Sequence, residues 1–379
     1  MNSINDDKLY SLGLEHYKKN KLDNSYDFLI KIKNKNLNTY KLISNIHIKK
    51  NDFKNAELTL NQILSFDKEN LFALNSLGDL NKLEKKYNVA EKFYKKTIFY
   101  DKNFVPGYFN LASLYEDKGE LKLAKDLYLK VVEIDNKNYA AYFNLQRLDD
   151  NSVTEETIIK IENEIKFNKD SHDKNIAYGH FVLAKYYRKK NKINMEIKEL
   201  SKGHKMFFDS DPINKNAVNY WLEKVPKKMN KKILFNNTDK NKFKSSNFEP
   251  IFIFGIPRSG TTLVETIITS GEEKIYNAGE NFIIQKALQN SQLNKKIHET
   301  DDSLELDISF LRKNIIESYM EYFLIKSEKF KFIDRTMTNF FFSEILLELF
   351  PNAKIINCKR DSFHNLVAIY QQCLNNLPW

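Results

Sequence analysis

Residues 251–263, Ile-Phe-Ile-Phe-Gly-Ile-Pro-Arg-Ser-Gly-Thr-Thr-Leu, combine the residue types that an anion-binding loop requires. The apolar residues at the start predict a buried strand, and the residues after Gly260 predict the first turn of a helix. Gly255 and Gly260 permit the chain between them to turn tightly. The first N–H groups of a helix lack partners within the helix and lie at the positive end of its dipole. The sequence therefore predicts a cradle for a phosphate group.

The identity of residue 261 limits which phosphate compounds the loop is expected to bind. The spacing of the two glycines matches the P-loop pattern G-x-x-x-x-G-K-[ST], but Thr261 occupies the position of the lysine. That lysine reaches the β- and γ-phosphates of a nucleotide beside a magnesium ion, so its absence argues against a kinase or an ordinary nucleotide triphosphatase. The cation of this loop is instead Arg258, inside the turn.

Residues 254–263 closely resemble the 5′-phosphosulfate loop of sulfotransferases. Members of this family bind 3′-phosphoadenosine 5′-phosphosulfate (PAPS) as a co-substrate, without a metal. The resemblance implies that the donor is bound by these loop residues: Gly255, Pro257, Arg258, Ser259, Gly260, Thr261 and Thr262. It also implies in-line transfer of the sulfuryl group, with Arg258 and the loop amides stabilising charge on the departing phosphate. The alternative interpretation is a strand–turn–helix corner of some other α/β protein.

A candidate base follows the next predicted strand, residues 274–278. The resemblance implies that Glu280, in a Gly-Glu pair, deprotonates the acceptor. Some relatives use the second of two consecutive glutamates, and Asn281 stands at that position here. The alternative role for Glu280 is to accept hydrogen bonds in its loop or to cap a helix.

Two further segments resemble signatures of the same family. Residues 332–340, Phe-Ile-Asp-Arg-Thr-Met-Thr-Asn-Phe, look like a segment that begins Asp-Lys and continues through a proline to Asn-Phe. Arg335 replaces the lysine that contacts the transferring group, and Met337 replaces the proline. The resemblance implies that Arg335 is catalytic and contacts the phosphosulfate, although the guanidinium is longer than an ammonium group and is aimed differently.

The third signature spans residues 346–361, where a helix is expected to end at Phe-Pro and a buried strand to deliver Arg360. By resemblance, Arg360 holds the 3′-phosphate, and a guanidinium can give one phosphate two parallel hydrogen bonds. The serine that the family places eight residues later is Ala368 here, and Ser362 is a candidate substitute. A salt bridge at the end of the strand is the alternative role for Arg360.

The first part of the chain repeats itself. Residues 71–104 superpose on residues 105–138 with a shift of 34 residues, the tetratricopeptide length. The shared positions include an alanine that lets two helices approach closely (56, 90 and 124) and an aspartate that begins a turn (67, 101 and 135). An earlier copy is predicted at residues 10–36. Such an array presents a groove to a polypeptide. The alternatives are a scaffold for the neighbouring domain and a helical bundle without a regular superhelix.

These patterns together predict an α-solenoid followed by a P-loop-type, three-layer α/β sulfotransferase domain with a mainly parallel sheet. We assign residues 1–150 to the repeat array, 151–235 to divergent capping helices and 248–379 to the sulfotransferase domain, which we expect to be incomplete at its C-terminal end. Strands are predicted near residues 250–254, 274–278, 331–334 and 353–359. The helix at 261–270 is expected to direct Leu263, Val264, Ile267 and Ile268 toward the core.

The composition of the whole chain limits its class. At 379 residues it is long enough for two domains, and its few glycines (10) and prolines (7) favour helices over turn-rich β structure. The formal charge of +10 comes from lysines scattered among acidic residues, so we predict no nucleic acid partner. The two cysteines fit no disulfide framework or zinc site, and neither a signal peptide nor an apolar run of bilayer length is present. We therefore expect a cytoplasmic protein with no metal and no membrane partner.

Two functions remain open at this point. The first is a sulfotransferase that moves a sulfuryl group from PAPS to a hydroxyl or amine acceptor, such as a tyrosine of a protein. The second is a repeat adaptor whose sulfotransferase domain is degenerate or incomplete, which the departures at Asn281, Met337 and Ala368 favour.

Overall fold

The computed structural model describes residues 5–50, 52–167, 174–210, 232–236, 248–271, 274–288, 303–325 and 330–371. The chain divides into two compact units, Met1–Glu199 and Leu200–Trp379. Residues 211–231, which are part of the predicted capping helices, lie outside the described residues. Cys373, one of the two cysteines, lies outside them as well.

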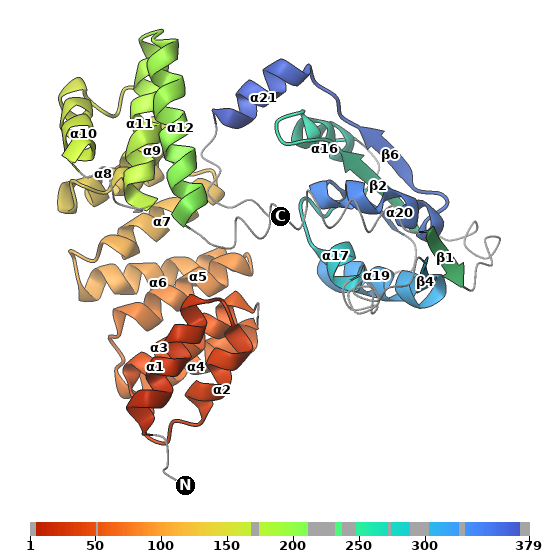
Figure 1. The fold of residues 1–379 in the computed structure, drawn as a ribbon, viewed down its shortest axis with the longest axis horizontal. Helices are drawn as coiled ribbons and strands as arrows, with labels where there is room; N and C mark the ends of the chain where they lie inside the picture. Colours follow the sequence, from red (N-terminus) through yellow and green to blue (C-terminus); the bar gives the residue numbers. More distant parts are fainter. Residues whose placement is uncertain are drawn as a thin grey trace. The chain divides into compact units, whose positions relative to one another are not determined.

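The first unit is a succession of helix pairs, coloured from red to green in Figure 1. Its helices are α1 (Asp6–Lys18), α2 (Leu22–Ile30), α3 (Leu37–Lys49), α4 (Phe53–Phe66), α5 (Leu71–Leu83), α6 (Tyr87–Tyr100), α7 (Val105–Asp117), α8 (Leu121–Ile134), α9 (Tyr139–Leu148), α10 (Glu155–Phe167) and α11 (Lys174–Lys189). The helix α12 (Ile193–Ser210) follows and extends past the boundary of the unit. The pairs predicted from the repeat are present, including the earliest copy, which forms α1 and α2.

The repeated residues explain why these helices pack. The alanines at 56, 90 and 124 are completely buried. At Gly78 a β-carbon would lie 2.4 Å from the ring of Tyr94, so α5 and α6 can approach this closely only with glycine there. The aspartates at 67, 101 and 135 each accept a hydrogen bond from the backbone N–H two residues later, at 3.2, 2.8 and 3.1 Å. The predicted turns between helix pairs are therefore Asx turns.

The second unit contains a parallel four-stranded sheet in the order β3-β5-β2-β6. These strands are β2 (Phe248–Phe254), β3 (Ile275–Asn277), β5 (Phe330–Asp334) and β6 (Lys354–Asn357). A separate parallel pair joins β1 (Lys232–Asn236) to β4 (Ser303–Asp307). The other described elements of this unit are α16 (Thr261–Thr269), α17 (Ile283–Leu288), α19 (Ile308–Phe323), the 3₁₀ helix η3 (Met337–Phe342), α20 (Ser343–Leu349) and α21 (Ser362–Tyr370).

The sheet lies between two helical layers because β2 alternates its apolar side chains between the two faces. Phe252 packs in a core with residues of α17, α19 and α20, whereas Ile251 and Ile253 pack against Val264 and Ile268 of α16. Figure 1 shows α16 and α20 on opposite sides of β2. The predicted three-layer α/β fold is therefore confirmed, and the four predicted strands of the main sheet are present.

Three local predictions were wrong. Leu263 and Ile267 are 65% and 62% exposed, because only the side of α16 that carries Val264 and Ile268 faces the sheet. The strand β6 was expected to be buried, but most of it is exposed, since it pairs only with β2 among the described strands. Residues 232–235 were assigned to helices but lie in β1, because pairing with the distant β4 overrides the local pattern.

No described helix is both long enough and apolar enough to cross a lipid bilayer.

Candidate functional site

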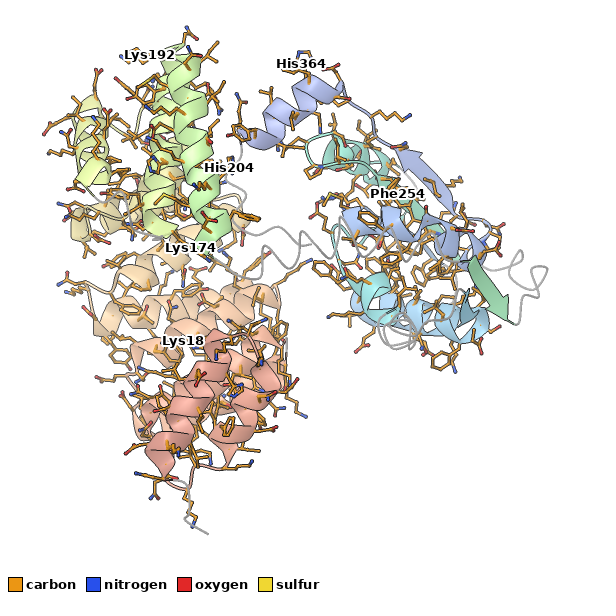
Figure 2. All side chains as sticks on the ribbon, in the orientation of Figure 1. Lys18, Lys174, Lys192, His204, Phe254 and His364 are labelled. Atoms are coloured by element: carbon orange, nitrogen blue, oxygen red, sulfur yellow. The ribbon has the colours of Figure 1, made fainter. Side chains whose placement is uncertain are left out.

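The predicted anion loop joins β2 to α16 and is closed against the end of β6. Phe254, the last residue of β2 (Figure 2), accepts a hydrogen bond of 2.7 Å from the backbone N–H of Cys358. A β-carbon at Gly255 would lie 2.4 Å from Oγ of Ser259 and 3.0 Å from the carbonyl oxygen of Cys358. Gly260 has φ 99°, a left-handed conformation that favours glycine. Both glycines are therefore required by the geometry of the turn.

Two carbonyl groups of the loop bind donors from the segment after β6. The carbonyl of Pro257 accepts a hydrogen bond of 3.0 Å from Nδ2 of Asn365, a fully buried residue of α21. The carbonyl of Arg258 accepts one of 3.2 Å from Nη1 of Arg360. Within the described part of the chain, no side chain caps the N-terminus of α16. The carbonyls of Pro257 and Arg258 thus accept hydrogen bonds, while no described side chain accepts one from the N–H groups of the first turn of α16.

The side chains of the loop differ in exposure. Arg258 is exposed and has φ 67°, which is unusual for a residue with a β-carbon. Thr261 is half-buried and Thr262 is exposed. Oγ of Ser259 is buried and has no hydrogen-bond partner among the described residues. A buried hydroxyl without a partner is costly, so Ser259 fits a site where a ligand oxygen completes the bond.

A second charged group lies at the ends of β3 and β5. Nε of Arg335 donates a hydrogen bond of 2.7 Å to Oε2 of Glu265, and Nη1 donates to Glu280. The side chain of Glu280 is 61% exposed, whereas those of Arg335 and Glu265 are 19% and 5% exposed. Sequence reasoning missed Glu265, because a single glutamate on a short helix after an anion loop has the pattern of an ordinary surface residue.

The backbone around Arg335 is fixed by a buried hydrogen-bond network. Asp334 is 1% exposed and accepts hydrogen bonds from the hydroxyl of Tyr319 and, at 2.7 Å, from the backbone N–H of Thr336. Burial raises the pKa of the Asp334 carboxyl, while hydrogen bonds from Thr336 and Tyr319 oppose this shift. Burial and the charge of Asp334 raise the pKa of the Tyr319 hydroxyl well above its usual value. Asp334 therefore fixes the backbone on both sides of Arg335 through its bond to Thr336.

Asn281 belongs to the same network. Its backbone N–H donates to Oγ1 of Thr336 at 2.8 Å, and the same hydroxyl donates back to its carbonyl oxygen at 2.7 Å. The backbone N–H of Arg335 donates to the carbonyl of Gly279 at 3.0 Å. These bonds tie the loop after β3 to the loop after β5, and they place Glu280 beside Arg335.

The four candidate groups follow the order of the strands. In a parallel sheet all the strands end at one edge, so the residues after β3, β5, β2 and β6 lie there side by side. The order across that edge is Glu280, Arg335, the anion loop and Arg360. The contacts of Arg335 with Glu280 and of Arg360 with the loop agree with this order.

The side chains of His364 and Cys358, near the third signature, contact none of these four candidate groups in the described hydrogen bonds and ion pairs. His364, in the first turn of α21 (Figure 2), is exposed and its ring contacts Asp361 at 2.7 Å. Cys358 is half-buried in the core on the α16 side of the sheet, and burial raises the pKa of its thiol. Among the described residues, no three His, Cys, Asp or Glu side chains gather as a metal site would require.

The fold and the edge of the sheet define an α/β domain with a glycine-bounded loop, carrying an internal arginine, between β2 and α16. Comparison with known families shows which family this domain resembles. Residues 250–378 match the model of the sulfotransferase family, and residues 105–138 match the model of the tetratricopeptide repeat. The chain thus carries a sulfotransferase-family domain after tetratricopeptide repeats.

Individual relatives cover parts of the chain. A protein of Aquifex aeolicus (strain VF5), described only as uncharacterized, is 37% identical over 136 residues, which are 32% of this chain and 17% of that protein. Among solved structures, a crystal structure of MamA is similar to 52% of this chain and 94% of its own, at 15% identity and a TM-score of 0.33. The structure of PilF from Pseudomonas aeruginosa is similar to 56% of this chain and 96% of its own, at 13% identity and a TM-score of 0.38.

Proposed function

We propose that this protein transfers a sulfuryl group from PAPS to a hydroxyl or amine acceptor. The order of groups along the edge of the sheet carries the proposal: a candidate base, a cation, an anion loop and a second cation. This order matches a donor whose sulfonate lies toward Arg335, whose 5′-phosphate lies in the loop and whose 3′-phosphate lies toward Arg360.

The residues of the loop fit the 5′ end of this donor. Ser259 offers a hydroxyl that lacks a partner among the described residues, and a β-carbon at Gly255 would clash with that hydroxyl. The hydroxyls of Thr261 and Thr262 follow at the N-terminus of α16, where the helix dipole favours negative charge. Arg360 already contacts the loop through Nη1, and its other guanidinium nitrogens can form hydrogen bonds to the 3′-phosphate.

The transfer step follows from these positions. The acceptor oxygen or nitrogen forms a bond to sulfur while the bond between sulfur and the bridging oxygen of the 5′-phosphate breaks. The electron pair of that bond stays on the phosphate, where Arg258 and the loop amides stabilise the growing charge. Glu280 takes the proton of the acceptor, and its exposed carboxylate can be reached from solvent.

The acceptor class is inferred from the repeats. Arrays of helix pairs bind polypeptides through an open face, so a polypeptide that docks on the first unit and presents a tyrosine hydroxyl is the acceptor we favour. Of the three departures from the family pattern, Asn281 has a structural role, because its side-chain Oδ1 accepts a hydrogen bond of 2.9 Å from the backbone N–H of Ile283, and the candidate base Glu280 remains. Ala368 supplies no hydroxyl for the 3′-phosphate, which is the observation that favours the adaptor alternative.

A transfer assay with a loop variant tests the proposal. The protein is incubated with PAPS labelled in the sulfonate and with tyrosine peptides, sugars or small phenols, and label in the acceptor is measured. In Gly255→Ala the new β-carbon meets backbone and side-chain atoms that cannot all move, so we expect donor affinity to fall roughly tenfold to hundredfold.

The matched control is Gly271→Ala, where the nearest atom to a new β-carbon is 3.5 Å away. It should bind and transfer like the unaltered protein. If no acceptor is labelled and the unaltered protein does not consume PAPS, the adaptor alternative is favoured instead.

A further inference from the structure

Arg335 is shared by two carboxylates that differ in their surroundings. Glu265, on α16, is almost completely buried and binds Nε at 2.7 Å. Glu280, after β3, is mostly exposed and binds Nη1. Breaking a buried ion pair is much more costly than breaking an exposed one, because a buried charge left without its partner cannot be solvated. The bond to Glu265 is therefore the permanent one, and the bond to Glu280 is exchangeable.

The chemistry of arginine makes this division possible. The guanidinium group carries Nε and two terminal nitrogens in one plane, so it can bind Glu265 through Nε while the terminal nitrogens bind another anion. A lysine has a single nitrogen and would have to divide it between the two. An arginine at position 335 can therefore bind the buried Glu265 and a second anion at the same time.

Glu265 is also attached to the donor loop. It lies in the second turn of α16, the helix that begins at the anion loop after Gly260. The other carboxylate oxygen of Glu265, Oε1, is buried and has no hydrogen-bond partner among the described residues. Because Glu265 is part of α16, its bond to Nε holds Arg335 at a fixed place relative to the N-terminus of that helix.

We infer that Glu265 is a positioning residue that orients Arg335 toward the sulfonate of the donor. This role rests on the proposed function. When the donor binds, its sulfonate takes the terminal nitrogens of Arg335 from Glu280, and Glu280 becomes free to accept the proton of the acceptor. Donor binding thus releases the Glu280 carboxylate from Arg335 before the acceptor reacts.

The test compares ligands with and without the sulfonate. Calorimetry measures the affinity of the full chain for PAPS and for adenosine 3′,5′-bisphosphate, and the transfer assay measures kcat. We expect Glu265→Ala to leave bisphosphate affinity unchanged, and to weaken PAPS binding and lower kcat by roughly tenfold, because a hydrogen bond between charged groups is lost. Glu265→Gln keeps an oxygen acceptor for Nε and should restore most of the loss.

The same substitution in an Arg335→Ala background separates positioning from a direct effect. If Glu265 acts through Arg335, Glu265→Ala should change PAPS affinity no further in that background. Three results would overturn the role: equal losses of PAPS and bisphosphate affinity, unchanged kcat in Glu265→Ala, or a full additional loss in the Arg335→Ala background. Absence of PAPS binding by the unaltered protein would instead overturn the proposed function, and this role with it.

Discussion

Arg258→Ala is expected to lower the rate of sulfuryl transfer by about 10²–10³, the usual cost of removing one group that stabilises developing charge. Arg258 is the only cationic residue between Gly255 and Gly260, and its side chain is exposed at the turn. The Thr261 hydroxyl carries no charge, so it cannot replace the guanidinium. Alanine keeps a β-carbon at the left-handed position, so the backbone preference of the loop changes little. Turnover of labelled PAPS measures the effect.

A charge control distinguishes this local effect from a general one. Lys313, on α19, is 73% exposed, and Lys313→Ala removes the same charge from the same unit without touching the loop. It should transfer like the unaltered protein, and thermal unfolding should show that both variants are folded. If Arg258→Ala keeps its full rate of transfer, the assignment of Arg258 is wrong.

Glu280→Gln is expected to reduce turnover by about 10²–10⁴ while PAPS binding is retained, because the amide cannot accept the acceptor proton. The amide oxygen can still accept the hydrogen bond from Nη1 of Arg335, so the variant changes basicity more than packing. The measurements are single-turnover transfer and calorimetric PAPS affinity on the same preparation.

Glu317→Gln on α19 is the matched control. The side chain of Glu317 is 60% exposed, and among the described residues its ion pair is with the exposed Lys313. It should leave both turnover and affinity unchanged. Equal losses of turnover and affinity in Glu280→Gln would make Glu280 a structural residue and would leave the base unassigned.

Local sequence patterns predicted the parts of the site that depend on near neighbours. The Gly255–Gly260 spacing, the strands that precede the loop and Arg335, and the turns at each repeated aspartate all result from contacts within a few residues. The strand order β3-β5-β2-β6, which arranges these parts along one edge, depends on pairing between segments far apart in the sequence. The sequence identified the candidate groups but did not give their order.

The residues that the sequence analysis misjudged depend on the surroundings of a helix or strand. Glu265 is buried because α16 directs it toward Arg335, seventy positions later in the chain. Leu263 and Ile267 have apolar side chains but face away from the sheet. Periodicity indicates that a helix is amphipathic, but which polar residue is covered and which apolar residue is exposed depends on the elements that pack against it.

The proposed transfer requires that main-chain amides and Arg258 bind the 5′ end of a 3′-phosphorylated nucleotide without a divalent ion. Calorimetric titration of the full chain with adenosine 3′,5′-bisphosphate, in the presence of a chelator and again with magnesium, tests it most directly. We expect binding with a Kd in the micromolar range, which corresponds to a binding free energy of about −8 kcal/mol, and the same affinity in both buffers. No detectable binding, or binding only with magnesium, would contradict it.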